Sequence, residues 1–300
     1  MSKLLETLRK TAHAEEYKLW PPPVFLIFLS FAQLCLFIYH AIHLSSEHGQ
    51  VISWHEPAPQ CSALIFNPTR RWEAWRYLTY SLVHSGIAHI TLNLAMQLFV
   101  GLPLEMSHGS LRIGIVYTSG VLFGSLATST FDPNMYLAGA SGGVYSLIMA
   151  HLASLILNWK EDIIIIRDRF RSNKMRSATN SSVYRLLRLL SVVIYSVCDI
   201  TYAIYLRLTD TTNNIGYLAH LAGGIAGIMV GLVVLKNRKS EAWEKAIKIV
   251  TLMITLSIMI LALVWNIKGD DIYMDIFHNE QPYFQAQDTS SVHNCTYVFI

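Results

Sequence analysis

One serine stands among glycines at the start of a long apolar run, in the stretch Gly139-Ala140-Ser141-Gly142-Gly143. Turn-forming residues precede the run at 132–134, and it stays apolar to about residue 157, so we expect Ser141 in the first turn of a helix. Unpaired backbone N–H groups and the positive end of the helix dipole gather there, and both favour a developing oxyanion. The same glycine pattern is typical of helix packing in membranes, so Ser141 alone does not establish a nucleophile.

A second group of polar residues opens another apolar run, with His84 at its mouth and His89 and Asn93 inside it. His89 and Asn93 are four residues apart, so they share one face of a helix. Polar side chains within a membrane are costly and usually face the interior of a helix bundle. The pair fits hydrogen-bond donors in a site, and it also fits a purely structural pair.

Another histidine, His220, opens a run in which Gly223, Gly227 and Gly231 repeat at every fourth position. Glycines at this spacing form a smooth ridge along a helix, which lets a neighbouring helix approach closely. His220 lies three residues before Gly223 and therefore on the same ridge. We expect the ridge to contact the glycine patch that begins at Gly142.

Helices must position these residues, and the composition indicates that the helices cross a membrane. Hydrophobic residues make up 53% of the 300 residues and charged residues 14%, and the apolar residues fall in long runs. A run of about 20 residues spans the hydrocarbon core, where a chain of this kind must be helical. We therefore predict an all-α polytopic membrane protein. The seven runs cover residues 23–43, 87–104, 111–129, 138–157, 186–206, 215–235 and 247–264.

Positive charges set the expected orientation. Most of the 23 Lys and Arg residues fall in segments that are cytoplasmic if the N-terminus lies inside, which puts the C-terminus outside. The net charge of +3 therefore reflects cytoplasmic loops, not a nucleic-acid surface. We expect no signal peptide, because the first run is long and follows a polar segment. The predicted parts are a cytoplasmic segment 1–22, a six-helix core 23–235 with a long outer loop 44–83, a linker 236–246, a seventh helix 247–266 and an outer tail 267–300.

The second, fourth and sixth runs all start on the outer side in this topology, so their polar residues lie near one depth. Ser141 would be a nucleophile there, and His220 can take its proton and return it to a leaving amine. No third acidic residue is evident, which favours a Ser/His dyad over a triad. His89, Asn93 and the Ser141 amide would donate to the oxyanion, and Tyr145 would stack on the His220 ring. The predicted reaction is peptide hydrolysis at the outer edge of the membrane.

Together these residues resemble the rhomboid intramembrane serine proteases over about residues 70–235. The resemblance implies a nucleophile at Ser141, a general base at His220 and oxyanion donors at His89 and Asn93, without a metal or cofactor. It also implies that Gly139 shapes the turn before the serine and that Arg76 supports the first loop. The matching motifs are Trp75-Arg76, the array of His84, His89 and Asn93, the stretch Gly139-Ala140-Ser141-Gly142 with Tyr145, and Ala219-His220 followed by Gly223 and Gly227.

The seventh run, with Pro21-Pro22-Pro23-Val24-Phe25 and Gly101-Leu102-Pro103-Leu104-Glu105-Met106, resembles the metazoan, fruit-fly Rhomboid-like secretase branch of that family. That branch cleaves type I membrane proteins, including EGF-family growth-factor precursors, in or beside the membrane segment. The resemblance implies transmembrane protein substrates as partners, within a lipid bilayer of the secretory pathway or the plasma membrane. The sequence identifies neither the substrate nor the oligomeric state.

Two other functions fit parts of the pattern. A non-catalytic binder of membrane helices, acting in trafficking or quality control, would keep the packing motifs without needing Ser141 or His220. A channel or transporter could use Asp199 and the histidines as a proton relay, but the histidines gather at one depth rather than along a pathway.

The remaining features of the outer side and of the seventh run bear less on chemistry. The seventh run has no ionisable residue between positions 251 and 265 and is interpreted as a membrane anchor. Cys61 and Cys295 both fall on the predicted outer side, where a disulfide is chemically allowed. Asn294 begins a glycosylation sequon on the same side.

Overall fold

The computed structural model describes residues 22–48, 51–54, 59, 62–132, 135–158, 216–237 and 242–277, with single helical positions at 190, 193, 194, 197 and 201. Of the seven predicted runs, the fifth falls almost wholly outside these residues, and Asp199 falls outside with it. The predicted N-terminal segment up to residue 21, Cys61, Cys295 and Asn294 also lie outside the described residues.

Each of the six other runs forms a helix. Five of these helices are long and apolar enough to cross a membrane, and the sixth is apolar and 17 residues long. At a rise of about 1.5 Å per residue, even the shortest covers most of a hydrocarbon core. The predicted all-α polytopic membrane fold is confirmed. The helices are α2 (Val24–His48), α4 (Gly86–His108), α5 (Ser110–Phe131), α6 (Ser141–Leu157), α9 (Tyr217–Val234) and α10 (Ala242–Phe277).

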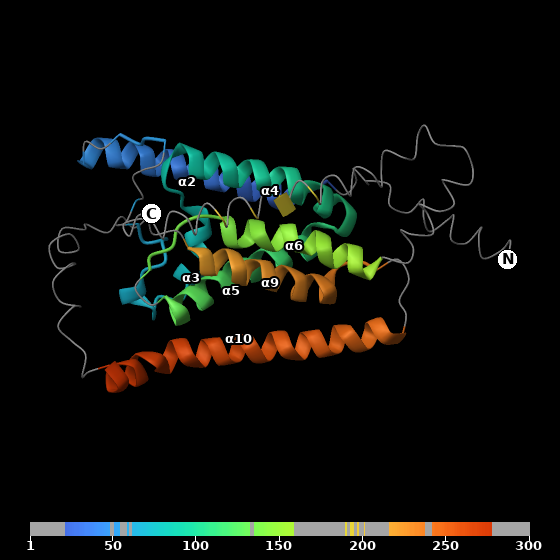
Figure 1. Cartoon of the computed structure of the whole chain (residues 1–300). Helices are drawn as coiled ribbons and strands as arrows, with labels where there is room; N and C mark the ends of the chain where they lie inside the picture. Colours follow the sequence, from blue (N-terminus) through green and yellow to red (C-terminus); the bar gives the residue numbers. More distant parts are fainter. Residues whose placement is uncertain are drawn as a thin grey trace.

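α5, α6 and α9 form the centre of the bundle, with α2 and α4 along one side and α10 along the other (Figure 1). α4, α6 and α9 start at the same end. Near their starts, His84 accepts a hydrogen bond from Ala140; near their ends, the ring of His108 contacts Ser154 and Lys236. This parallel arrangement brings the polar residues at the three helix starts to one end of the bundle.

α6 meets its neighbours through glycines, as the spacing on α9 predicted. A Cβ atom built on Gly227 would lie 2.6 Å from the Cα atom of Ser146, and one on Gly223 would overlap the backbone of Gly142. From the other side, a Cβ atom on Gly120 of α5 would lie 2.7 Å from the carbonyl oxygen of Gly142. Only residues without a side chain let three helices approach this closely.

α2 is fastened to α4 by polar side chains instead. The buried carboxylate of Glu105 accepts the backbone N–H groups of Phe25 (2.7 Å) and Leu26 (3.0 Å). These groups belong to the first turn of α2, where the helix offers them no carbonyl partner. About two turns earlier in α4, Gln97 donates hydrogen bonds to Ser30 and Gln33 of α2, in the interior of the bundle.

The long loop between α2 and α4 is structured where it is described. It contains a 3-10 turn at Pro68–Arg70, the short helix α3 at Arg76–Thr79 and a second 3-10 turn at Tyr80–Leu82. Its backbone also forms an isolated antiparallel bridge between Phe66 and Leu137. The loop therefore reaches the segment that leads into α6.

Arg76 fills the inside of this loop. The residue is 1% exposed, and its side chain donates to the carbonyl oxygens of Ser62 (3.0 Å) and Ile65 (2.8 Å) and forms an ion pair with Glu73. Buried carbonyl groups need donors, and a guanidinium carries five N–H groups in a fixed fork. Arg76 is therefore a structural centre of the first loop and lies within it, not against α6.

Candidate active site

The segment before Ser141 is fastened to the first loop at three points. Leu137 exchanges two backbone hydrogen bonds with Phe66 (3.0 and 3.1 Å). The N–H of Gly139 donates to the carbonyl oxygen of Tyr80 (3.0 Å), and the N–H of Ala140 donates to Nε2 of His84 (3.3 Å). The backbone immediately ahead of the serine is therefore held by hydrogen bonds on consecutive residues.

Gly139 has a backbone geometry that this segment requires. Its φ angle is +119°, a region that side-chain-bearing residues rarely adopt. A Cβ atom at this position would also lie 2.6 Å from both Cε1 and Nε2 of His89. Gly139 thus turns the chain into α6 and leaves room for an imidazole at the turn.

Ser141 is the first residue of α6, in the first helical turn as predicted. Ala140 precedes it as the N-cap and provides no side-chain cap for the helix. The first N–H groups of α6 are therefore free of an N-cap side chain, next to a hydroxyl that is half-buried. This is the geometry in which backbone amides can stabilise negative charge on a bound carbonyl.

His220 lies in the first turn of α9, directly against α6. Its ring stacks on the ring of Tyr145, with centroids 4.5 Å apart and planes 14° from parallel. Tyr145 follows Ser141 by four residues and so lies one turn below it on the same face. The stack predicted from the sequence is present, and the contact of Gly223 with Gly142 keeps the two helix starts together.

His89 presents one particular nitrogen to the turn before Ser141. The backbone N–H of Ser85 donates to its Nδ1 at 3.4 Å, and the Ser85 hydroxyl lies 3.1 Å from the same atom. Because Nδ1 accepts a hydrogen bond, the proton of the neutral ring is on Nε2, the atom beside Gly139. A donor at this position would be available to an oxyanion, and the oxyanion role of His89 stays a prediction.

His84 is buried and acts on the backbone rather than at the opening of the site. Burial, and then the neighbouring His89, hold the pKa of His84 well below its ordinary value. Its neutral ring accepts the Ala140 N–H, and the His84 and His89 rings meet edge to face at 5.2 Å. His84 therefore supports both the segment before Ser141 and the ring of His89.

Asn93 lies one turn further into the bundle than His89. Its side-chain amide donates to the carbonyl oxygen of His89 in the same helix, at 2.9 Å. A carboxamide has two N–H groups, so a second one is left for an oxyanion. The structure thus brings Ser141, His220, Tyr145, His89, His84 and Gly139 to one end of the bundle, and sets Asn93 behind them.

Tyr80 is a residue of this site that sequence reasoning missed. Its hydroxyl donates to the carbonyl oxygen of Val121 (2.9 Å) in α5, and its own carbonyl oxygen accepts the N–H of Gly139. A Cβ atom on Gly142 would lie 3.0 Å from that hydroxyl, so Tyr80 also touches the start of α6. Its position four residues before His84 was the one available signal.

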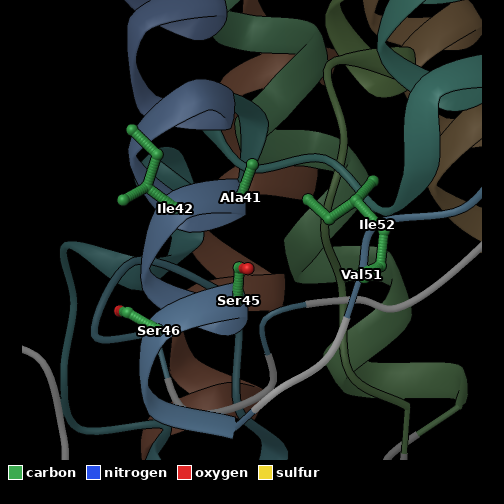
Figure 2. A pocket seen from close by; sticks show the side chains of 6 residues that line it. All are labelled: Ala41, Ile42, Ser45, Ser46, Val51 and Ile52. Carbon is green, nitrogen blue, oxygen red and sulfur yellow. The ribbon is translucent and has the colours of Figure 1, made fainter.

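An open hollow lies elsewhere, beside the end of α2 (Figure 2). Its lining offers hydroxyl groups but no imidazole, acid or amine to take a proton, so it has no nucleophile and base together. Within the described part of the chain, no three His, Cys, Asp or Glu side chains are grouped as around a metal ion. The hollow is lined by Ala41, Ile42, Ser45, Ser46, Val51 and Ile52.

Comparisons with known proteins match the part of the chain that contains the candidate site. A Rhomboid domain model matches residues 71–237, which include all the site residues described above. The chain is 38% identical over 233 residues to mouse Rhomboid-related protein 2, covering 77% of this chain and 70% of the relative. It is 33% identical over 257 residues to human Rhomboid-related protein 3, covering 84% of this chain and 58% of the relative. It is 34% identical over 226 residues to the Caenorhabditis elegans Inactive rhomboid-related protein 2, covering 75% of this chain and 58% of the relative.

Proposed function

Because the chain belongs to the rhomboid family, we propose that it is an intramembrane serine endopeptidase with a Ser141/His220 dyad. Family membership supports intramembrane proteolysis or a related rhomboid-like function in a multi-pass membrane protein. The narrower proposal is carried by one observation, the stack of Tyr145 on His220 beside the first turn of α6. This stack holds the His220 imidazole next to the start of α6, where Ser141 is located.

The proposed reaction begins when Oγ of Ser141 attacks the scissile carbonyl carbon and His220 accepts the hydroxyl proton. The oxyanion takes hydrogen bonds from Nε2–H of His89, the Ser141 amide and the second N–H of Asn93, each worth about 3 kcal/mol in enzymes of this kind. His220 then gives its proton to the leaving amine, which breaks the peptide bond. Water, deprotonated by His220, hydrolyses the acyl-enzyme and restores the serine.

The proposed substrates are single-span, type I membrane proteins, among them EGF-family ligand precursors, whose ectodomains are released. The dyad lies at the ends of spanning helices, so the cut falls at the edge of the membrane. A scissile carbonyl inside a regular helix is already hydrogen-bonded, so a substrate must unwind there. Small or helix-breaking residues near the cut favour this unwinding.

The proposed topology follows the charge distribution. The N-terminus is cytoplasmic, the dyad faces the lumen or the extracellular side, and the C-terminus is on that same side. We propose the predicted order of parts, a segment 1–22, a core 23–235, a linker 236–246, a seventh helix 247–266 and a tail 267–300, with one correction. The seventh helix is α10 (Ala242–Phe277), so it begins within the predicted linker and ends within the predicted tail.

A second candidate function is a non-catalytic binder of membrane helices. The observation that favours it is the similarity to a relative named as inactive, at 34% identity over 226 residues. Such a binder would need the glycine contacts of α6 and α9 but no reactive serine.

Labelling by a fluorophosphonate probe separates the two functions. We expect the purified wild-type protein to label and to cleave a co-reconstituted transmembrane substrate, and we expect Ser141→Ala and His220→Ala to lower cleavage more than about 1,000-fold. Ser119→Ala is the matched control, because among the described residues the Ser119 hydroxyl donates to the Ile115 carbonyl oxygen of its own helix, α5. A wild-type protein that stays unlabelled, or a cleaving Ser141→Ala variant, would exclude the protease.

A further inference from the structure

The seventh helix, α10, presents a row of mostly small and polar residues to the bundle. At successive intervals of three or four residues, Thr251, Thr255, Met259, Ala262 and Asn266 are buried or half-buried. The residues between them are exposed, as expected for a lipid-facing surface. α10 packs along α9 and α5 on this side (Figure 1). Since lipid is as apolar as a leucine side chain, hydrophobicity does not fix such a helix, and specific contacts must.

Asn266, the last residue of this row, makes the specific contacts of α10. Its Nδ2 donates to the hydroxyl of Thr130 (3.2 Å), in the last turn of α5, and to the Ala262 carbonyl oxygen (2.8 Å). Its Oδ1 accepts the hydroxyl of Tyr77 (3.3 Å), in α3 of the first loop. One carboxamide therefore ties α10 to α5 and to the first loop at once.

A short series of contacts continues from Tyr77 to the nucleophile. The Tyr77 ring meets the Phe66 ring edge to face, with centroids 5.0 Å apart. Phe66 forms the two backbone hydrogen bonds with Leu137, and Leu137 is two residues before Gly139. Tyr77, Phe66 and Leu137 are buried, and Asn266 is half-buried. The contact between the Tyr77 hydroxyl and the Asn266 carboxamide is a hydrogen bond, which lipid cannot replace.

We infer that Asn266 is a positioning residue for Ser141, acting through Tyr77 and the Phe66–Leu137 bridge. This inference rests on the proposed serine protease function. Asn266 touches neither the dyad nor the oxyanion donors. It fixes the Tyr77 hydroxyl, which fixes the ring against Phe66 and so the backbone that leads into the turn at Gly139. Small displacements at this point matter, because an error of about 1 Å in a reacting group lowers rates by up to about 100-fold.

The seventh helix then takes part in catalysis and is more than a membrane anchor. An anchor would hold the folded chain together without changing the reactivity of Ser141 in each folded molecule. A positioning residue changes that reactivity at constant folded fraction. It acts on kcat more than on KM, since it contacts no substrate.

The test uses the full chain in bicelles, with Asn266→Leu, Tyr77→Phe and the double variant. Ile267→Ala is the control, because Ile267 is the next residue on α10 and is 78% exposed. The measurements are kcat and KM on a transmembrane substrate, the rate of fluorophosphonate labelling, and the thermal midpoint. We expect each single variant to lower kcat and the labelling rate about 5- to 10-fold with KM unchanged, and the control to have no effect.

The double variant decides whether the two residues act on one route. We expect it to be no slower than Asn266→Leu alone, because both changes remove the same contact. Additive losses, or a lower thermal midpoint with unchanged rates per folded molecule, would overturn the inference. If Asn266→Leu does not fold, Tyr77→Phe alone decides by the same rates. An unlabelled wild-type protein would instead overturn the proposed function, so the two failures are distinct.

Discussion

Two parts of the bundle hold their helices together in opposite ways. α6 packs against α5 and α9 at Gly120, Gly223 and Gly227, where an added Cβ atom would overlap the backbone of Gly142 or Ser146. α2 and α4 are joined by long polar side chains, Gln97 and Glu105, which reach across from one helix to the other. Both serve to join helices in a membrane, and they differ in how much movement they permit.

Where backbone meets backbone, as at Gly223 and Gly227, no side-chain rotation can make room for a shift of the helices. A shift of α9 against α6 would have to separate or overlap rigid groups, so steric repulsion sets the position of His220 relative to Ser141. A polar side chain can change rotamer and keep its bond while the helices move. In membranes such a bond contributes only about 0.6 kcal/mol on average. The proposed dyad therefore lies in the part of the bundle with the least freedom to move.

The largest effect is expected from Gly223→Val. The new Cβ atom would overlap the backbone of Gly142, which no side-chain rotation can relieve, so α9 must move away from α6. We expect the free energy of unfolding to fall by about 3 kcal/mol or more, and labelling of Ser141 to be lost. Detergent unfolding and probe labelling of the same preparation measure both quantities.

The neighbouring residue provides the control for this change. A Cβ atom on Gly224 would lie 3.3 Å from the flexible side chain of Met149, which can yield. Gly224→Ala should therefore change the free energy of unfolding by less than about 1 kcal/mol and keep labelling. Equal effects of the two substitutions would show that close contact is not what positions His220.

The next largest effect is expected from Glu105→Leu, in the other part of the bundle. It leaves the N–H groups of Phe25 and Leu26 without acceptors and removes the acceptor of the Ser110 hydroxyl (2.6 Å). We expect the free energy of unfolding to fall by about 3 kcal/mol, because hydrogen bonds to a charged group are strong and the orphaned groups are buried. Labelling per folded molecule should stay near normal, since Glu105 lies far along α4 from His89.

Labelling of Glu105→Leu and Gly223→Val is compared at an equal loss in the free energy of unfolding. If labelling in the folded fraction of Glu105→Leu also collapsed, the α2–α4 contact would position the dyad as strictly as the glycines do. Glu105→Gln is the intermediate control. It keeps one acceptor oxygen and should lose about half as much stability.

Much of the fold follows from the sequence because hydropathy and length decide which segments cross a membrane. The four-residue spacing of Gly223 and Gly227 also predicted the contact with Gly142, since that spacing defines one helix face. Hydropathy does not mark where a helix ends. α10 is 36 residues long and extends beyond the predicted run 247–264, because backbone hydrogen bonds continue into polar surroundings.

Contacts between distant polar residues could not be predicted. The bond from Phe25 to Glu105 joins residues 80 positions apart, and no local pattern encodes the pairing. Asn266 lies at the edge of a run that indicates only an anchor, and its partners Tyr77 and Thr130 become evident in the folded chain. For Asn93 the pattern predicted an inward face, but not the hydrogen bond to the His89 carbonyl.

A smaller effect is expected from pH, through His84 at the edge of the close-packed part. Burial and His89 hold its pKa well below the ordinary value of 6.5, so the unfolded chain binds a proton that the folded chain does not. Stability is therefore complete above pH 6.5 and is lost as pH falls below it toward the folded-state pKa, by up to about 1.4 kcal/mol per pH unit. Protonation would also remove the acceptor of the Ala140 N–H.

Unfolding of the wild-type protein and of His84→Gln, compared between about pH 7.5 and about pH 5, measures this term. Glutamine keeps an acceptor for the Ala140 N–H and does not titrate. We expect the variant to lose less stability on acidification than the wild-type protein does. If both proteins lost equal stability per pH unit, groups other than His84 would cause the acid sensitivity. The His84 contact would then not belong to the close-packed part of the bundle.

The smallest effect is expected from Gln97→Leu, at the polar contact of α2 with α4. Gln97 donates to Ser30 (2.8 Å) and to Gln33 (3.1 Å), and its own carbonyl oxygen has no hydrogen-bond donor among the described residues. Leucine gives up two bonds but removes that buried, unsatisfied oxygen, so the net change in the free energy of unfolding should stay within about 1 kcal/mol. Gln33→Leu is the contrast, because it also removes the donors to the Ser81 carbonyl (3.0 Å) and the Tyr117 hydroxyl (3.2 Å) and should cost more. A loss above about 2 kcal/mol for Gln97→Leu would mean that this polar contact fixes its helices as firmly as glycine packing fixes the dyad.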